Sequence, residues 1–100
     1  MTTREEYLPV LDWFFIKVDN KLNLPKNIKK SHWQNMSTWE LFDRLKDEIT
    51  ELEDKLQINS KQTHYLGVDD WTAENIISEC ADITAFAMMI ADHFKLWEQK

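Results

Sequence analysis

The chain has 100 residues, of which 43% are hydrophobic and 30% are charged, and these proportions predict a single soluble domain spanning residues 1–100. The formal net charge of −6 argues against nucleic acid as the main partner, because binding to a phosphate backbone needs clustered lysine and arginine. One cysteine excludes an internal disulfide. The sequence shows no apolar signal region and no stretch suited to crossing a membrane, so we expect a cytoplasmic protein without a membrane partner.

Residues 2–22 repeat apolar side chains at helical spacing. Thr3 and Glu6 have the spacing of a capping box, whereas Pro9 lacks a backbone donor and disfavours a helix interior. Two interpretations are open, a helix that bends at Pro9 and a helix that begins there, and we favour a start near Pro9. We expect this helix to serve packing rather than chemistry.

A polar connection, residues 23–37, concentrates positive charge in an otherwise acidic chain. Lys29 and Lys30 lie in this basic stretch, shortly before Trp33. One interpretation is a solvated loop. The other is a loop whose lysines contact phosphate groups while Trp33 forms an aromatic wall for a base.

The next helix is predicted over residues 37–56. Ser37 as the N-cap and Glu40 three residues later form a capping box. Trp39 lies in the first turn, where it either packs against the preceding loop or lines a pocket. The apolar stripe of this helix consists of Leu41, Leu45, Ile49, Leu52 and Leu56.

The last helix is predicted over residues 76–94, after a linker at residues 57–70 that holds the single glycine. Asp70 or Thr72 is expected to cap it. Apolar residues cover far more of its circumference than the stripe of roughly 100° that a surface helix needs. A chain of this length cannot cover such a helix alone, so we expect a homodimer or a homotetramer.

Two pairs of carboxylates lie on these two helices, Glu48 with Glu51 and Glu79 with Asp82. Helical residues three apart are neighbours on one face, and both pairs border apolar side chains. If the helices pack antiparallel, the four carboxylates can converge. Oxygen ligands without nearby cysteine or histidine suit a hard cation, Mg²⁺ or Mn²⁺.

The carboxylates of the first pair also have a purely structural interpretation. Arg44 precedes Glu48 by four residues, and Lys55 follows Glu51 by four. Such pairs stabilise a solvated helix by a few tenths of a kcal/mol, roughly. The matching spacing in the last helix favours the metal site over these ion pairs.

The two acidic motifs resemble the E-x-x-E…E-x-x-D signature of the MazG-like all-α nucleoside triphosphate pyrophosphatases. In this chain the motifs begin at Glu48 and Glu79, with 27 residues between them. Residues 45–52 and 79–92 are similar to the same group over their whole length. The resemblance covers roughly residues 29–93.

The resemblance implies an all-α bundle of three to four helices per chain, completed by dimerisation, and hydrolysis of a nucleoside triphosphate to the monophosphate and pyrophosphate in nucleotide-pool housekeeping. It implies Mg²⁺, with Mn²⁺ as the alternative, and Glu51 or Glu48 as the group that orients or deprotonates the attacking water. The implied metal ligands are Glu48, Glu51, Glu79 and Asp82. The candidate substrate contacts are Lys29, Lys30, Trp33, Trp39 and Phe86.

A second class of function fits the same chain, namely a non-catalytic acidic helical dimer that binds a nucleotide or a protein. Many members of the MazG-like group carry two consecutive glutamates in each motif. This chain has Asp47-Glu48 and Ser78-Glu79 instead. A screen of nucleotides with Mg²⁺ for pyrophosphate release separates the two functions.

Overall fold

The computed structural model describes residues 2–23, 33–62 and 70–95, and every regular element in these ranges is helical. The elements are α1 (Arg4–Leu22), the short 3-10 turn η1 (Trp33–Asn35), α3 (Thr38–Gln62) and α4 (Asp70–His93). The prediction of an all-α fold is therefore confirmed. No helix in the described ranges is both long and apolar enough to cross a membrane.

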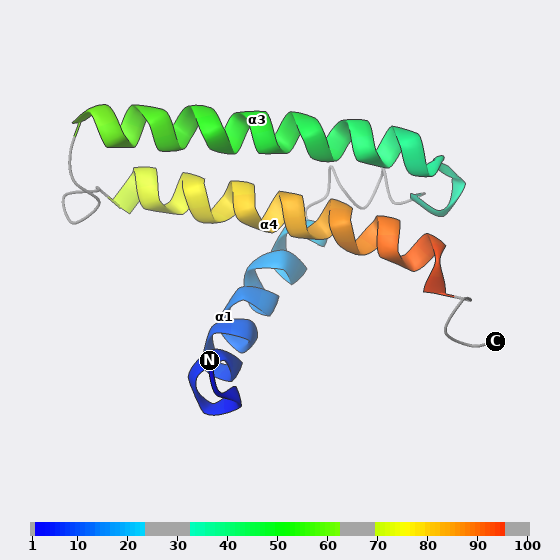
Figure 1. The fold of residues 1–100 in the computed structure, drawn as a ribbon, viewed down its shortest axis with the longest axis horizontal. Helices are drawn as coiled ribbons and strands as arrows, with labels where there is room; N and C mark the ends of the chain where they lie inside the picture. The colour runs from blue at the N-terminus through cyan, green and yellow to red at the C-terminus, as the bar shows by residue number, and fades with distance from the viewer. Residues whose placement is uncertain (1, 24–32, 63–69, 96–100) are drawn as a thin grey trace.

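The helices α3 and α4 lie side by side and run in opposite directions as a long hairpin (Figure 1). Three residues of the apolar stripe of α3 pack in the hairpin: Leu41 is 0% exposed, and Leu45 and Leu52 are half-buried. Ile49 and Leu56 of the same stripe are exposed. The antiparallel arrangement is the condition under which the carboxylates of the two helices were expected to converge.

Both ends of the hairpin differ from the sequence-based boundaries. The α3 helix continues past residue 56 to Gln62, because the added residues contain neither glycine nor proline and nothing in them stops a helix. The α4 helix already begins at Asp70, so Thr72 lies inside the helix and does not cap it. The cap expected at Ser37 is confirmed, since its Oγ accepts a hydrogen bond from the Glu40 backbone N–H at 3.0 Å.

His93 connects the C-terminal end of α4 to the start of α3. Its Nε2 lies 3.1 Å from the carbonyl oxygen of Trp33, and its Nδ1 lies 2.9 Å from Oγ1 of Thr38. A carbonyl only accepts, so Nε2 of His93 carries a proton and donates to Trp33. The indole N–H of Trp33 also donates to Asp92, at 3.3 Å.

The prediction that the first helix starts near Pro9 is wrong, because α1 begins at Arg4 and passes through Pro9. A proline this close to the helix start removes one intrahelical hydrogen bond and leaves a single turn before it. The N–H groups of Glu6 and Tyr7 both bond to the carbonyl oxygen of Thr3, at 3.0 and 3.2 Å. The Thr3 side chain makes no capping bond, so the expected capping box is absent.

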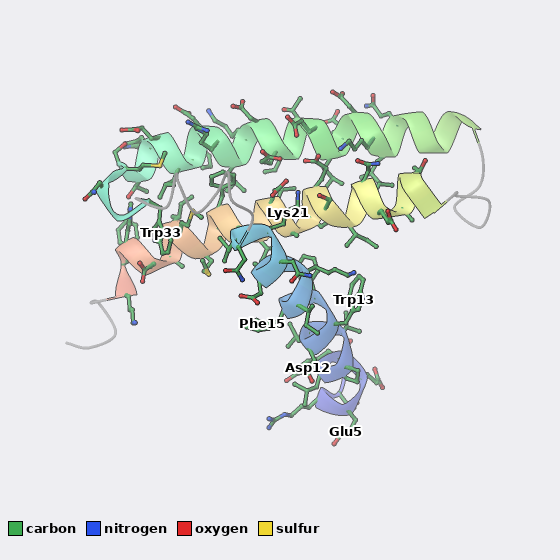
Figure 2. The ribbon with its side chains drawn as sticks, turned by 180° about the vertical axis from the view of Figure 1, so that it is seen from behind. Glu5, Asp12, Trp13, Phe15, Lys21 and Trp33 are labelled. Carbon is green, nitrogen blue, oxygen red and sulfur yellow. The ribbon has the colours of Figure 1, made fainter. Side chains whose placement is uncertain are left out.

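Only the C-terminal half of α1 packs on the hairpin, while its N-terminal half projects away from it (Figure 1). Val18 is buried against Ala81 and Ala85 of α4, with Phe14 and Leu22 packed around them. Figure 2 shows Trp13 and Phe15 on the projecting part. The exposed large hydrophobic residues of α1 are Tyr7, Leu8, Val10, Leu11, Trp13, Phe15 and Ile16.

Candidate metal centre

Three of the four carboxylates predicted as metal ligands meet between α3 and α4. One oxygen atom each from Glu48, Glu51 and Glu79 lies within 4.8 Å of the other two. Glu79 is only 7% exposed, whereas Glu48 is half-buried and Glu51 is exposed. We call these three residues the acidic cluster. It runs from a buried base at Glu79 to a solvent-facing rim at Glu51.

Two oxygen atoms in the acidic cluster are buried without a hydrogen-bond donor. These are Oε2 of Glu48 and Oε2 of Glu79, which find no donor among the described residues while both carboxyl groups are ionised. A proton on Glu48 allows a hydrogen bond between the two groups. Burying a carboxylate oxygen without a donor is unfavourable, and either a proton or a cation removes the cost. This feature distinguishes the cluster from an acidic surface that water solvates.

Lys55 neutralises part of the charge of the cluster. Its Nζ donates to Oε1 of Glu79 at 2.6 Å, across the hairpin. The alternative ion pair between Lys55 and Glu51, which the sequence analysis disfavoured, is not among the ion pairs of the described residues. The buried Glu79 has lost its water and gains more from an ammonium group than the exposed Glu51 does. Arg44 and Glu48, both within the described ranges, likewise form no ion pair.

Asp82, the fourth predicted ligand, lies beside the cluster and is held by a different lysine. Its Oδ2 accepts a hydrogen bond from Nζ of Lys21 on α1 at 3.2 Å, and the two side chains are 23% and 21% exposed. The charge of Asp82 still reaches Glu48 and raises its pKa. Sequence reasoning gave Lys21 no role. A signal was present, because Lys21 follows the core residue Val18 by three positions and so borders the packed face of α1.

The pKa values of the two buried carboxyl groups shift in opposite directions. Burial, a hydrogen bond with Glu79 and the charges of Asp82 and Glu51 together raise the pKa of Glu48 to about 8. Burial also acts to raise the pKa of Glu79, but hydrogen bonds from Lys55 and from Glu48 and Glu51 outweigh it and hold that pKa below its ordinary value. At neutral pH Glu48 is therefore the protonated member and Glu79 the charged one.

Two of the predicted aromatic contacts lie far from the cluster. Trp33 is bonded to Asp92, which is 13 residues beyond Glu79 and therefore about 20 Å further along α4. Trp39 is 75% exposed and makes an edge-to-face contact with Phe42, with ring centroids 6.1 Å apart. Within one chain, neither tryptophan is brought to the carboxylates.

Phe86 is the aromatic candidate nearest to the acids along the chain. It lies one turn beyond Asp82 on α4 and is half-buried. Lys29 and Lys30 fall outside the described residues, so their assignment to phosphate binding stays a prediction.

Comparison of the chain with models of protein families, with curated proteins and with solved structures finds no match. The resemblance to the MazG-like group therefore rests on the motif residues themselves. The function has to be argued from the geometry and charge of the acidic cluster.

Proposed function

We propose that the protein is a divalent-cation-dependent hydrolase that converts a nucleoside triphosphate to its monophosphate and pyrophosphate. The observation that carries the proposal is the pair of buried oxygens without donors on Glu48 and Glu79, within a cluster of three carboxylates. A cation between these oxygens would satisfy both of them. A set of oxygen ligands alone suits Mg²⁺ or Mn²⁺.

The residues of the site have separate tasks in this proposal. Glu48, Glu51 and Glu79 would hold the ion, and Asp82 would join them when its ion pair with Lys21 opens. When bound, a divalent cation supplies positive charge that stabilises the phosphoryl groups and the leaving pyrophosphate. Glu51 lies at the solvent-facing rim, so it is suited to orient the attacking water and accept its proton, with Glu48 as the second choice.

We also propose a helical bundle of the MazG-like type that is completed by a second copy of the chain, as a dimer or a tetramer. The exposed hydrophobic residues of α1 support this, since a monomer would leave them in water. The dimensions agree: the radius of gyration is 15.7 Å, against about 13 Å for a compact domain of 100 residues. The partner could then supply the base contacts that one chain does not bring to the cluster.

A non-catalytic binding module remains the second candidate function. It is favoured by the two lysines that pair with Glu79 and Asp82, because they balance part of the acidic charge without a metal ion. In that case the protein would fold and bind partners with no need of Mg²⁺.

The test is a screen of nucleoside triphosphates with Mg²⁺ for release of pyrophosphate. We expect release by the wild type and none by Glu51→Gln or Glu79→Gln. Glu53→Gln is the matched control, since Glu53 is an exposed glutamate of the same helix outside the cluster, and it should keep full activity. Absence of pyrophosphate release from every nucleotide would favour the binding module.

A further inference from the structure

A cavity of about 300 Å³ lies between α1 and α4, beside the acidic cluster. The α1 helix lines it with Lys17, Asn20 and Lys21, and α4 contributes Ser78 and Glu74 among its polar residues. None of these residues except Lys21 touches the acidic cluster or its Asp82 neighbour through a described hydrogen bond or ion pair. The cavity is therefore a separate feature that shares one residue with the candidate metal centre.

The lining of this cavity combines the apolar side chains of Ile77 and Ala81 with hydrogen-bond donors, and its formal charge is positive. Two lysines, Lys17 and Lys21, and one carboxylate, Glu74, line it in a chain whose formal net charge is −6. The Nζ of Lys17 also lies 5.8 Å from the ring centroid of Trp13. The Asn20 amide and the Ser78 hydroxyl add uncharged donors. Lysines together with neutral donors are the groups that bind phosphate oxygens.

Lys21 joins the cavity to the acidic residues. Its Nζ is 3.2 Å from Oδ2 of Asp82, and it sits where α1 meets the hairpin (Figure 2). Both side chains of this ion pair are partly exposed, at 21% and 23%, so solvent screens part of the attraction between them. A cation that draws Asp82 toward the cluster would remove one contact of Lys21, whose side chain also lines the cavity.

We propose that the cavity between α1 and α4 binds phosphate groups through Lys17 and Lys21. When a nucleoside triphosphate is bound, the cavity would hold the two phosphates that leave as pyrophosphate. This identification of the ligand rests on the proposed function. Lys21 is then a positioning residue, which pairs with Asp82 in the free protein and with phosphate in the complex. The cavity, unlike the basic loop predicted from the sequence, lies wholly within the described part of the chain.

The experiment measures the affinity of inorganic pyrophosphate in the presence of Mg²⁺ by titration calorimetry, which needs no catalysis. Replacing Lys17 and Lys21 together with Gln should weaken binding at least tenfold. Lys17→Gln alone should weaken it severalfold, and this exposed position does not endanger folding. Lys46→Gln is the matched control, because Lys46 makes an exposed ion pair with Asp43 on α3, away from the cavity.

A second arm uses a methylene-bridged, non-hydrolysable nucleoside triphosphate as a competitor. If the analogue competes with pyrophosphate for the same lysines, the cavity binds the phosphates of the substrate. If pyrophosphate binds and the analogue does not compete, that assignment is overturned. Equal affinity in the wild type and the double variant, or no binding to the wild type, would overturn the phosphate site itself. Unchanged KM in the double variant with intact hydrolysis would remove this site and leave the proposed function standing.

Discussion

Glu48 and Glu79 show how two carboxyl groups of the same chemistry acquire different properties from their neighbours. Glu79 has Lys55 within 2.6 Å, which favours its charged form. Glu48 faces Glu79, Glu51 and Asp82 from a partly buried position and so retains its proton. The cluster can therefore exist without a cation because Glu48 holds one proton. A cation that binds the cluster must displace this proton.

This proton makes the stability of the metal-free protein depend on pH. The pKa of Glu48 is about 8 in the folded state, against 4.5 as its ordinary value, so the folded protein binds more protons than the unfolded chain between these limits. The stabilising contribution is complete below pH 4.5 and is lost as the pH rises through 8. We expect Glu48→Gln to remove this decline from melting curves taken across the range and Glu53→Gln to keep it. A decline of the same size in wild type and Glu48→Gln would contradict the shifted pKa.

The residues of the cluster were predictable in part. The spacing of three residues places Glu48 and Glu51 on one face of α3 in any α-helix. The convergence with Glu79 depends on the register of the hairpin, which no local pattern specifies. The two lysine partners were missed because the ion pairs join residues 24 and 61 positions apart in the chain.

At the scale of the elements, apolar periodicity identified every α-helix in the described ranges but placed their ends poorly. Residues 57–62 lack an apolar period and still continue α3, because a helix can extend into solvent where no breaker stops it. Pro9 does not stop α1 from beginning at Arg4. The hydrogen bond that the proline removes is one bond, whereas the helix continues to Leu22. Local patterns thus predict the existence of these helices better than their lengths.

His93 links the end of α4 to the start of α3, because its ring bonds to Thr38 and to the carbonyl of Trp33. Each hydrogen bond of this kind contributes about 1 kcal/mol, so His93→Ala should lower the free energy of unfolding by about 1–3 kcal/mol. Urea denaturation measures the change. Lys95→Ala, an exposed substitution at the same helix end, should have little effect. Equal unfolding midpoints for these two variants would show that the His93 contacts do not hold the hairpin in register.

At the scale of the whole molecule, one chain does not cover its own hydrophobic surface. From the sequence we expected α4 to need cover from a second chain. The exposed large hydrophobic residues are instead concentrated on the projecting half of α1. This difference arises because α1 crosses α4 with its C-terminal half only, so α4 is partly covered and α1 is not. A second copy that packs on α1 would resolve both features.

Phe15 is the best position at which to test this assembly, because it is 69% exposed. We expect light scattering to give a multiple of the chain mass of 12.0 kDa for the wild type and a smaller particle for Phe15→Glu. A charge at the centre of an apolar interface is desolvated without a partner, which disfavours association. Glu5→Gln, at an exposed polar position of the same helix, should leave the assembly unchanged. A wild type that stays at 12.0 kDa at micromolar concentration would rule out the dimer.

The proposal as a whole depends on a cation binding to the folded acidic cluster, and melting curves with and without Mg²⁺ address this directly. An ion that binds only the folded protein raises its melting temperature. We expect Mg²⁺ to raise the melting temperature of the wild type and to lose this effect in Glu48→Gln. That variant should itself be more stable than the metal-free wild type at neutral pH, because Glu48 ionises on unfolding whereas Gln cannot. A wild type whose melting temperature responds neither to Mg²⁺ nor to Mn²⁺ would contradict the metal site and, with it, the proposed hydrolase.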